Sequence, residues 1–151
     1  MAVTVRPATL EDIPGIIDMG VEVCEESPFY KNFTPDYRQQ YSILTNAIQS
    51  INACVFVCDD LTGFFIGHIE KMPWFAEIRA TEDVLFVTRH KRMSRRAKLL
   101  LLAFLEWAAS KQVRLITAGV STGIHAEQTA SFYKKFGFSQ KESTMTFVKE
   151  S

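Results

Sequence analysis

The fold is decided by residues 84–105, where Val84-Leu85-Phe86-Val87 leads through the basic run Arg89-His90-Lys91-Arg92-Met93-Ser94-Arg95-Arg96 into the apolar stretch Leu99–Leu105. The first four residues show no polar alternation, so we expect a central strand that is covered on both faces. The apolar stretch predicts a deeply buried helix over Arg95–Gln112, because apolar side chains there surround the helix axis.

The basic run stands where this helix is expected to begin, and five of its eight residues are Lys or Arg. A cation at a helix N-terminus is unfavourable by roughly 0.3–1 kcal/mol, because that end of the helix carries a partial positive charge. The cost disappears when an anion binds the free backbone N–H groups of the first turn. With Ser94 as the N-cap, the run predicts a phosphate site on the amides of Met93–Ala97.

Two other interpretations of the basic run remain open. Charge runs are often solvated surface, so the run can be a basic loop that happens to precede a helix. A nucleic-acid patch is the second alternative, although no aromatic residue interleaves with the cluster to stack on bases.

The residues after this helix predict a parallel βαβ unit. Val113–Val120 forms the next strand, and an ordinary crossover makes it parallel to the strand before the helix. A last helix over Glu127–Phe136 is stopped by Gly137. Thr144–Val148 alternates like an edge strand.

The residues before residue 84 predict two helices and an antiparallel hairpin. A short strand, Val3–Val5, precedes a helix that starts at Thr9 and Asp12. A second helix starts at Thr34-Pro35-Asp36, with Thr34 as its cap and Pro35 at its first position; its expected buried stripe is Tyr37, Tyr41, Leu44 and Ile48. The predicted strands are Ala53–Cys58, Phe64–Met72 and Thr81–Thr88.

These elements predict an α/β fold with a mixed sheet, antiparallel in its N-terminal half and parallel in its βαβ core, flanked by helices. The 151 residues fit a single domain, 1–151. Seventeen basic residues balance seventeen acidic ones, which argues against bulk attraction to nucleic acid or a membrane surface. No apolar run approaches the roughly 20 residues that span a bilayer. Three cysteines without framework spacing favour reduced thiols, so we expect a cytoplasmic protein.

Three segments of the chain resemble a known family: Val5-Arg6-Pro7-Ala8-Thr9, Val87-x-x-x-x-Arg92-x-x-Arg95-x-Ala97 and Tyr133-x-x-x-Gly137-Phe138. They occur in the same order as the corresponding segments of that family. They resemble the signatures of the GNAT superfamily of N-acetyltransferases. Three departures accompany the resemblance. Arg95 replaces the central glycine, the usual proline after the strand is replaced around Arg89, and His125 or Ala126 stands where an asparagine often precedes the tyrosine helix.

The resemblance implies acetyl-CoA as co-substrate, with Tyr133 protonating the departing thiolate. The Val87 amide would polarise the thioester carbonyl, and arginine side chains would add charge at the pyrophosphate. The residues implied in acetyl-CoA binding are Leu85, Phe86, Val87, Arg92, Met93, Ser94, Arg95, Arg96, Ala97 and Lys98. Without the resemblance, Tyr133 would be interpreted as a core aromatic beside Phe132 and Phe136.

The general base and the acceptor site are less defined by the sequence. Asp83, Glu82 and Glu70 are the candidate bases, and period-2 counting puts Asp83 on the face of Leu85 and Val87; each can equally be a solvated charge. We expect His68 to be a hydrogen-bonded structural residue, and no histidine spacing indicates a metal site. The acceptor is expected near Glu25–Phe33, with Trp74 and Phe75.

The predicted function is acetyl transfer from acetyl-CoA to a primary amine of a small molecule or peptide, by direct attack in a ternary complex. The alternative is a CoA-binding module of the same fold that is regulatory or inactive, since the glycine and the asparagine are missing. A homodimer is a further expectation, because members of this superfamily are commonly dimers.

Overall fold

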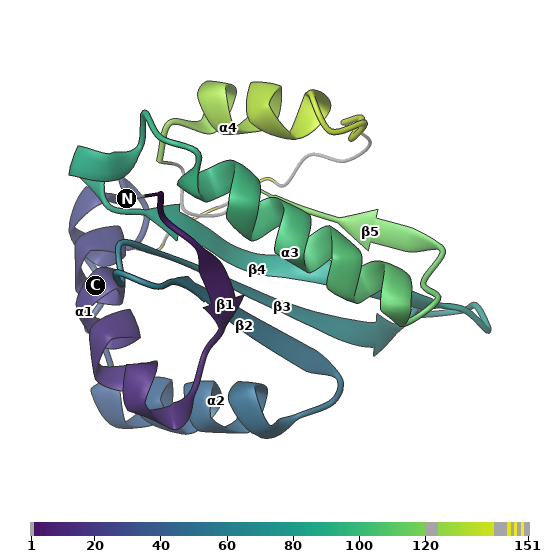
Figure 1. Ribbon diagram of the computed structural model, residues 1–151, viewed down its shortest axis with the longest axis horizontal. Coiled ribbons are helices and arrows are strands. Elements are labelled where there is room, and N and C mark those ends of the chain that lie inside the picture. Colours follow the sequence, from purple (N-terminus) through teal and green to yellow (C-terminus); the bar gives the residue numbers. More distant parts are fainter. Residues whose placement is uncertain (1, 120–123, 141–144, 146, 148, 150–151) are drawn as a thin grey trace.

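A mixed sheet forms the centre of the protein, as seen in a computed structural model that describes residues 2–119, 124–140, 145, 147 and 149. Its strand order follows the sequence (Figure 1). Neighbouring strands are antiparallel except the last two, which are parallel. The strands are β1 (Val5–Pro7), β2 (Ala53–Cys58), β3 (Gly63–Lys71), β4 (Ile78–Val87) and β5 (Leu115–Thr117). The predicted α/β class with an antiparallel front half and a parallel βαβ core is confirmed.

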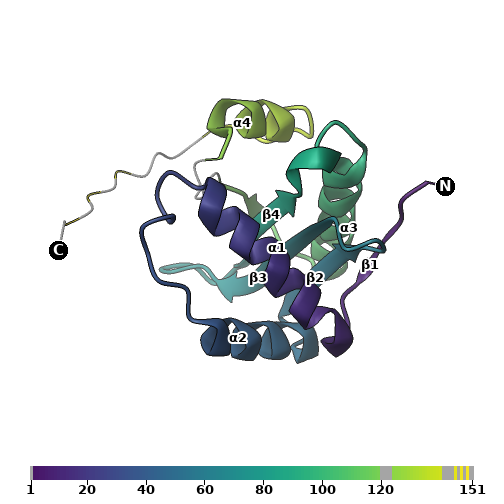
Figure 2. The ribbon, with the colours of Figure 1, turned by 90° about the vertical axis from the view of Figure 1, so that its left-hand side faces the viewer.

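Helices cover both faces of the sheet (Figure 2). One face packs against α1 (Ile13–Glu26) and α2 (Tyr37–Gln49), through a core that includes Ile16, Leu44 and Phe86. The other packs against α3 (Arg96–Ser110) and α4 (Ala126–Lys134), through Phe65, Leu101 and Tyr133. Both faces of β4 are therefore covered near its end, as expected for Val84–Val87.

The first helical segment is fixed by a capping box. A 3-10 turn over Leu10–Asp12 precedes α1, and the Asp12 carboxylate accepts a 2.8 Å hydrogen bond from the Thr9 amide. Arg6 donates to both oxygens of the same carboxylate, at 2.7 and 3.0 Å. The hydrogen bonds from Arg6 lower the pKa of Asp12 to about 2. This confirms the predicted helix start at Thr9 and Asp12.

The second helix differs from its prediction. Asp36, not Thr34, is the N-cap, because its carboxylate accepts from the Gln39 amide at 3.0 Å, and Tyr37 is the first helical residue. Leu44 is buried, but Tyr37 and Tyr41 are each 50 % exposed, so the predicted buried stripe is wrong at both tyrosines. The helix covers the sheet mainly over β2. Both tyrosines instead line a surface hollow together with Ile17 of α1.

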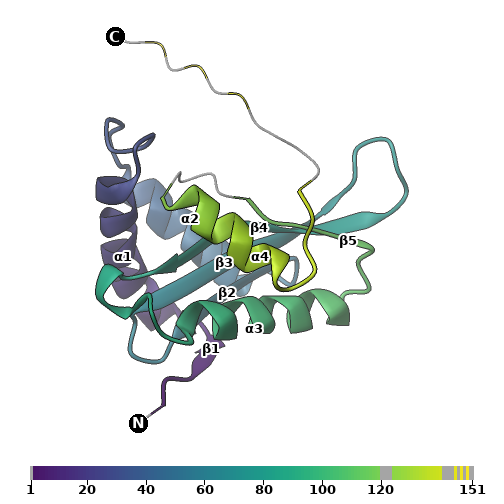
Figure 3. The ribbon, with the colours of Figure 1, turned by 90° about the horizontal axis from the view of Figure 1, so that it is seen from above.

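The strand bounds also differ from those expected. β4 begins at Ile78 rather than Thr81, because the β3–β4 hairpin closes further out, with the Met72 amide donating to the Glu77 carbonyl at 2.9 Å. This hairpin projects beyond the helices (Figure 3). β5 is shorter than expected, and the predicted strand Thr144–Val148 lies for the most part outside the described residues.

The long helix α3 is buried on one side rather than all round. Leu100, Leu101, Phe104 and Ala108 are buried, whereas Leu102 is 41 % exposed. Phe104 lies directly over Gly67 of β3, where an added Cβ would come within 2.8 Å of its ring. The glycine therefore allows α3 to approach the sheet beside β4.

Candidate active site

The site begins at an open edge of β4. β5 pairs with β4 only at Arg79, Ala80 and Thr81, so the rest of β4 has no strand on that side within the described residues. The Thr88 amide donates to the carbonyl of Thr62, the residue before β3, at 2.9 Å. In an antiparallel pair, the backbone groups of successive residues point alternately toward the partner strand and away from it. The N–H and C=O groups of Leu85 and Val87 therefore point toward the open edge. Leu85 and Val87 are among the residues that the family resemblance implies in acetyl-CoA binding.

Free backbone amides lie at the end of this edge. The amides of Met93, Ser94, Arg95, Ala97 and Lys98 donate to no acceptor within the described residues, and the first bond of α3 runs from Leu99 to the Arg95 carbonyl. Such a row of unpaired N–H groups at a helix start can hold a phosphate. Arg95 has φ −80°, so an arginine replaces the usual glycine there without backbone strain.

Arg92 is not free for phosphate, contrary to the expected role of its side chain. Its two terminal nitrogens donate to both carboxylate oxygens of Glu26, at 2.8 and 2.6 Å, and its Nε donates to the Val87 carbonyl at 2.8 Å. The guanidinium also lies 5.2 Å from the centre of the Phe86 ring. The Arg92 hydrogen bonds hold the pKa of Glu26 below its ordinary value.

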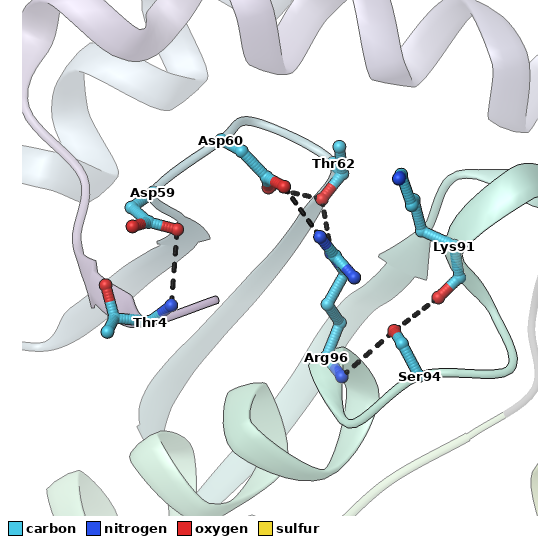
Figure 4. Close-up of polar contacts among 7 residues, drawn as sticks. All are labelled: Thr4, Asp59, Asp60, Thr62, Lys91, Ser94 and Arg96. Atoms are coloured by element: carbon cyan, nitrogen blue, oxygen red, sulfur yellow. Dashed lines mark hydrogen bonds and ion pairs between the residues drawn. The ribbon is translucent and has the colours of Figure 1, made fainter. Parts of the chain in front are cut away.

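Arg96 is likewise engaged by the protein (Figure 4). It donates to Asp60 and to the Thr62 hydroxyl, each at 2.6 Å, and Thr62 in turn donates to Asp60. Burial raises the pKa of Asp60, but the hydrogen bonds from Thr62 and Arg96 hold it below its ordinary value. The predicted contribution of the Arg96 guanidinium to phosphate binding would therefore require breaking this pair.

Ser94 is not the N-cap of α3, which is Arg95. The Ser94 hydroxyl instead donates to the Lys91 carbonyl and accepts from the Arg96 amide at 3.4 Å (Figure 4). It shapes the turn before the helix. Three exposed cations, Lys91, Arg95 and Lys98, have no side-chain partner within the described residues and are available to an anion.

A β-bulge corrects the predicted facing of the two acidic residues. Ile66 is paired with Val84 and Gly67 with Glu82, so Asp83 is an extra residue on β4. A bulge reverses the alternation of side chains. Glu82 therefore shares the α3–α4 face with Leu85 and Val87, and Asp83 lies on the opposite face, the reverse of what period-2 counting predicted.

Glu82 meets Tyr133 on the buried face. Its carboxylate accepts from the Gly119 amide at 2.9 Å and so bridges the gap between β4 and β5. Burial raises the pKa of Glu82 to about 7, despite this hydrogen bond. Burial, and then the Glu82 charge, raise the pKa of Tyr133 well above its ordinary value. The Tyr133 hydroxyl is buried and makes no hydrogen bond in the described part of the chain.

Asp83 lies on the half-exposed face, where it pairs with a histidine. The His68 Nδ1 is 2.8 Å from the Asp83 carboxylate, and its Nε2 is 3.7 Å from Glu70. Glu70 is held in turn by Arg79 at 2.6 Å, and the Arg79 hydrogen bond lowers the pKa of Glu70. His68 is thus hydrogen-bonded, as expected, but its partner is one of the candidate bases.

Aromatic side chains surround the expected acceptor region. Phe29, Tyr30 and Phe33 are exposed in the segment after α1. Trp74, at the tip of the β3–β4 hairpin, is 99 % exposed and has a φ of 73°, which is costly for a bulky residue. These residues belong to two separate segments, the one after α1 and the tip of the β3–β4 hairpin.

Solved structures match the chain over its whole length, whereas no protein-family model and no curated protein sequence does. The aminoglycoside N-acetyltransferase AAC(6')-Iy, in complex with a bisubstrate analogue, has a TM-score of 0.77 at 15% identity, with 100% of both chains covered. The fold is that of the GNAT acetyltransferases. An acetyltransferase from Trypanosoma brucei has a TM-score of 0.74 at 15% identity, covering 97% of this chain and 99% of its own. The aminoglycoside acetyltransferase HMB0005 from an uncultured soil sample has a TM-score of 0.71 at 15% identity, again with 100% of both chains covered.

Within this GNAT fold, the acidic partners of the arginines were not predicted from the sequence. Glu26 and Asp60 are each far from their arginine in the chain. The hydrogen bond from the Gly119 amide to Glu82 was not predicted either, because no sequence pattern marks Gly119. One signal was present. Glu22 and Glu26 lie in the C-terminal half of α1, where the partial negative charge of the helix disfavours acids. The helix-dipole argument that predicts an anion near the basic run would, in the same way, have predicted cationic partners for Glu22 and Glu26.

None of the helices in the described residues has the length and apolar character needed to cross a membrane. Within the same residues, no three or more His, Cys, Asp or Glu side chains are grouped so that they could hold a metal ion.

Proposed function

We propose that the protein transfers an acetyl group from acetyl-CoA to a primary amine. The observation that carries the proposal is the open edge of β4, where the Leu85 backbone groups and the Val87 N–H face away from β3. This edge leads directly to amides that are unpaired within the described residues, those of Met93, Ser94, Arg95, Ala97 and Lys98. An extended, amide-bearing arm that ends in a pyrophosphate fits both parts. Strand-like pairing would hold the arm, and the amides with Arg95 would hold the pyrophosphate.

The residues around this edge fit the needs of acyl transfer. The Val87 N–H would polarise the thioester carbonyl while the amine attacks. Tyr133 would give its proton to the departing thiolate, and its raised pKa keeps it protonated at neutral pH. We assign proton removal from the amine to Asp83 with His68, because they lie on the half-exposed face, opposite Tyr133.

The acceptor is proposed to be an amine on a small molecule. Two of the similar structures are aminoglycoside acetyltransferases, and exposed aromatic residues lie in the segment after α1. A peptide amine is the other acceptor of the same chemistry. We place the reaction in the cytoplasm, a reducing compartment that suits the free thiols of Cys24, Cys54 and Cys58.

A thermal-shift titration with acetyl-CoA tests the first half of the proposal. A ligand that binds only the folded state at 100 times its Kd stabilises it by about 2.7 kcal/mol. For a chain of this size that raises Tm by about 5–10 °C. No shift at millimolar acetyl-CoA, in a sample with a cooperative unfolding transition, would contradict acetyl-CoA binding.

Thiol release across a panel of primary amines tests the second half. An acetyltransferase releases free CoA with at least one amine, and the acetylated amine gains the mass of one acetyl group. The inactive CoA-binding alternative predicts a thermal shift with no amine-dependent thiol release. The two outcomes separate the hypotheses in one sample.

A further inference from the structure

Arg92 connects three parts of the molecule: the loop before α3, the end of β4 and the end of α1. Its backbone belongs to the loop that precedes α3, beside the free amides. Its Nε binds the Val87 carbonyl at the end of β4, and its terminal nitrogens bind Glu26 at the last residue of α1. One side chain therefore joins the loop, the strand and the helix that leads to the acceptor region.

The Glu26 end of this connection is rigid. The Glu26 side chain is 8 % exposed, and both of its oxygens are hydrogen-bonded to Arg92. Arg89 adds to the same junction, with its guanidinium 3.6 Å from Glu26 and its amide donating to Glu22 at 3.0 Å. A buried, two-pronged ion pair fixes distance and orientation together.

The chain turns immediately after Glu26 into the aromatic segment. Ser27 is fully buried and caps α1, and its hydroxyl accepts hydrogen bonds from the amides of Phe29 and Tyr30 at 3.2 and 3.1 Å. The Lys31 amide donates to the Ser27 carbonyl at 3.2 Å. The position of Glu26 therefore sets the position of the whole turn over residues 27–33.

Local preference does not account for this arrangement. A glutamate at a helix C-terminus is disfavoured by the helix dipole, and an arginine near a helix N-terminus is disfavoured in the same way. Here the two charges lie against one another, and their ion pair offsets the unfavourable interaction of each with its own helix dipole. The pair is thus a tertiary connection between two helix ends rather than a by-product of either helix.

We propose that Arg92 is a positioning residue that couples the acyl-CoA loop to the acceptor-facing turn over residues 27–33. The inference rests on the proposed function. When a pyrophosphate binds the amides of Met93–Lys98, the loop is held, Arg92 is held with it, and Glu26 and the turn lose freedom of motion. By thermodynamic reciprocity, an acceptor that orders the turn tightens the binding of acyl-CoA.

The neighbouring pair, Arg96 with Asp60, provides a matched control. It leaves the same loop and is also an arginine–carboxylate pair, but Asp60 lies in the turn between β2 and β3. Loss of this pair disturbs the loop without removing a contact of Glu26, because the same turn meets α1 only near its other end, where Leu61 lies beside Gly15. Arg92→Gln and Arg96→Gln therefore remove equal charge from the same surface, and only the first cuts the connection to Glu26.

Hydrogen exchange followed by mass spectrometry tests the coupling, with CoA itself as the probe. In the wild type and in Arg96→Gln, saturating CoA is expected to slow exchange of peptides within residues 27–36 by at least about fivefold, the lower end of ordinary coupling between sites. In Arg92→Gln, CoA is expected to protect residues 93–98 and leave residues 27–36 unchanged. Arg92→Lys should restore part of the effect.

The outcomes separate this inference from the proposed function. Failure of CoA to protect residues 93–98 in the wild type overturns the proposed function and the coupling together. Protection of residues 93–98 without protection of residues 27–36 overturns the coupling alone, as does protection of residues 27–36 that survives in Arg92→Gln. If Arg92→Gln does not fold, Glu26→Gln keeps the size and the hydrogen-bond acceptor, removes the charge, and is expected to lose the coupling in the same way.

Discussion

Glu82 and Asp83 are neighbours in the sequence, yet they occupy contrasting environments on the two faces of β4. Glu82 is turned into the layer of α3 and α4, where burial raises its pKa to about 7 and Tyr133 is close by. Asp83 is turned to the half-exposed face, where it pairs with His68 at 2.8 Å. The bulge at Asp83 shows how one extra residue can place two neighbouring carboxylates on opposite faces of a single strand.

The largest expected effect is on the buried face, at Tyr133. Tyr133→Phe should lower kcat about 100-fold or more, because general acid catalysis typically contributes that much. The melting temperature should not fall, because within the described residues the buried hydroxyl has no hydrogen-bond partner that the substitution would leave unpaired. Steady-state thiol release and a melting curve measure the two quantities. An unchanged rate would exclude Tyr133 as the general acid.

Glu82 should make stability depend on pH. Its pKa is about 7 in the folded protein against an ordinary value of 4.5, so between these values the folded state holds a proton that the unfolded state has lost. The free energy of unfolding therefore falls as pH rises through this range and levels off above it, by about 3 kcal/mol in all.

Glu82→Gln should flatten that dependence, because the amide does not titrate and can still accept from Gly119. Urea unfolding of both proteins from pH 4.5 to 8 measures it. Parallel curves for wild type and variant would show that Glu82 is not buried as a neutral acid.

Packing on the buried face should also be sensitive to one added carbon. Gly67→Ala would place a Cβ 2.8 Å from the Phe104 ring, and overpacking of this kind costs roughly 1–3 kcal/mol. Gly119→Ala is the matched control, since an added Cβ there meets nothing within 4 Å. Chemical denaturation of the two variants compares them, and equal stabilities would show that α3 does not lie as close to the sheet.

The smallest effects on stability are expected on the half-exposed face. His68→Gln and Asp83→Asn should each change the free energy of unfolding by less than about 1 kcal/mol, as is usual for exposed ion pairs. Each should lower kcat/KM about tenfold at pH 7. The loss should shrink at high pH, where the amine is already neutral. A loss that is independent of pH would exclude these two residues as the route for the amine proton.

The sequence predicted the layers of the fold because each relied on a local pattern. The apolar Val84–Val87 strand, the capping box at Thr9 and Asp12, and the parallel βαβ unit were all confirmed. The facing of Glu82 and Asp83 was predicted wrongly, because a bulge arises from pairing with β3 and leaves no mark in β4 itself.

In the candidate site, the positive charge before α3 indicated anionic partners but not their identity. The structure supplies two of them from the protein itself, the carboxylates of Glu26 and Asp60, whereas a bound phosphate stays a prediction. Charge pattern does not distinguish a ligand's phosphate from a carboxylate that comes from a distant part of the chain. The backbone amides of residues 93–98 and the side chain of Arg95 keep the role that the sequence suggested as a prediction.

Residue-resolved NMR of the backbone amides during an acetyl-CoA titration tests most directly whether the open edge of β4 is an acyl-CoA site. The structure predicts that the largest shifts occur at the Val87 amide and at Met93–Lys98, with little change on β1 or on the outer face of α2. Saturable binding that leaves Val87 and residues 93–98 unshifted, while amides elsewhere move, would contradict the assignment of this edge to acyl-CoA.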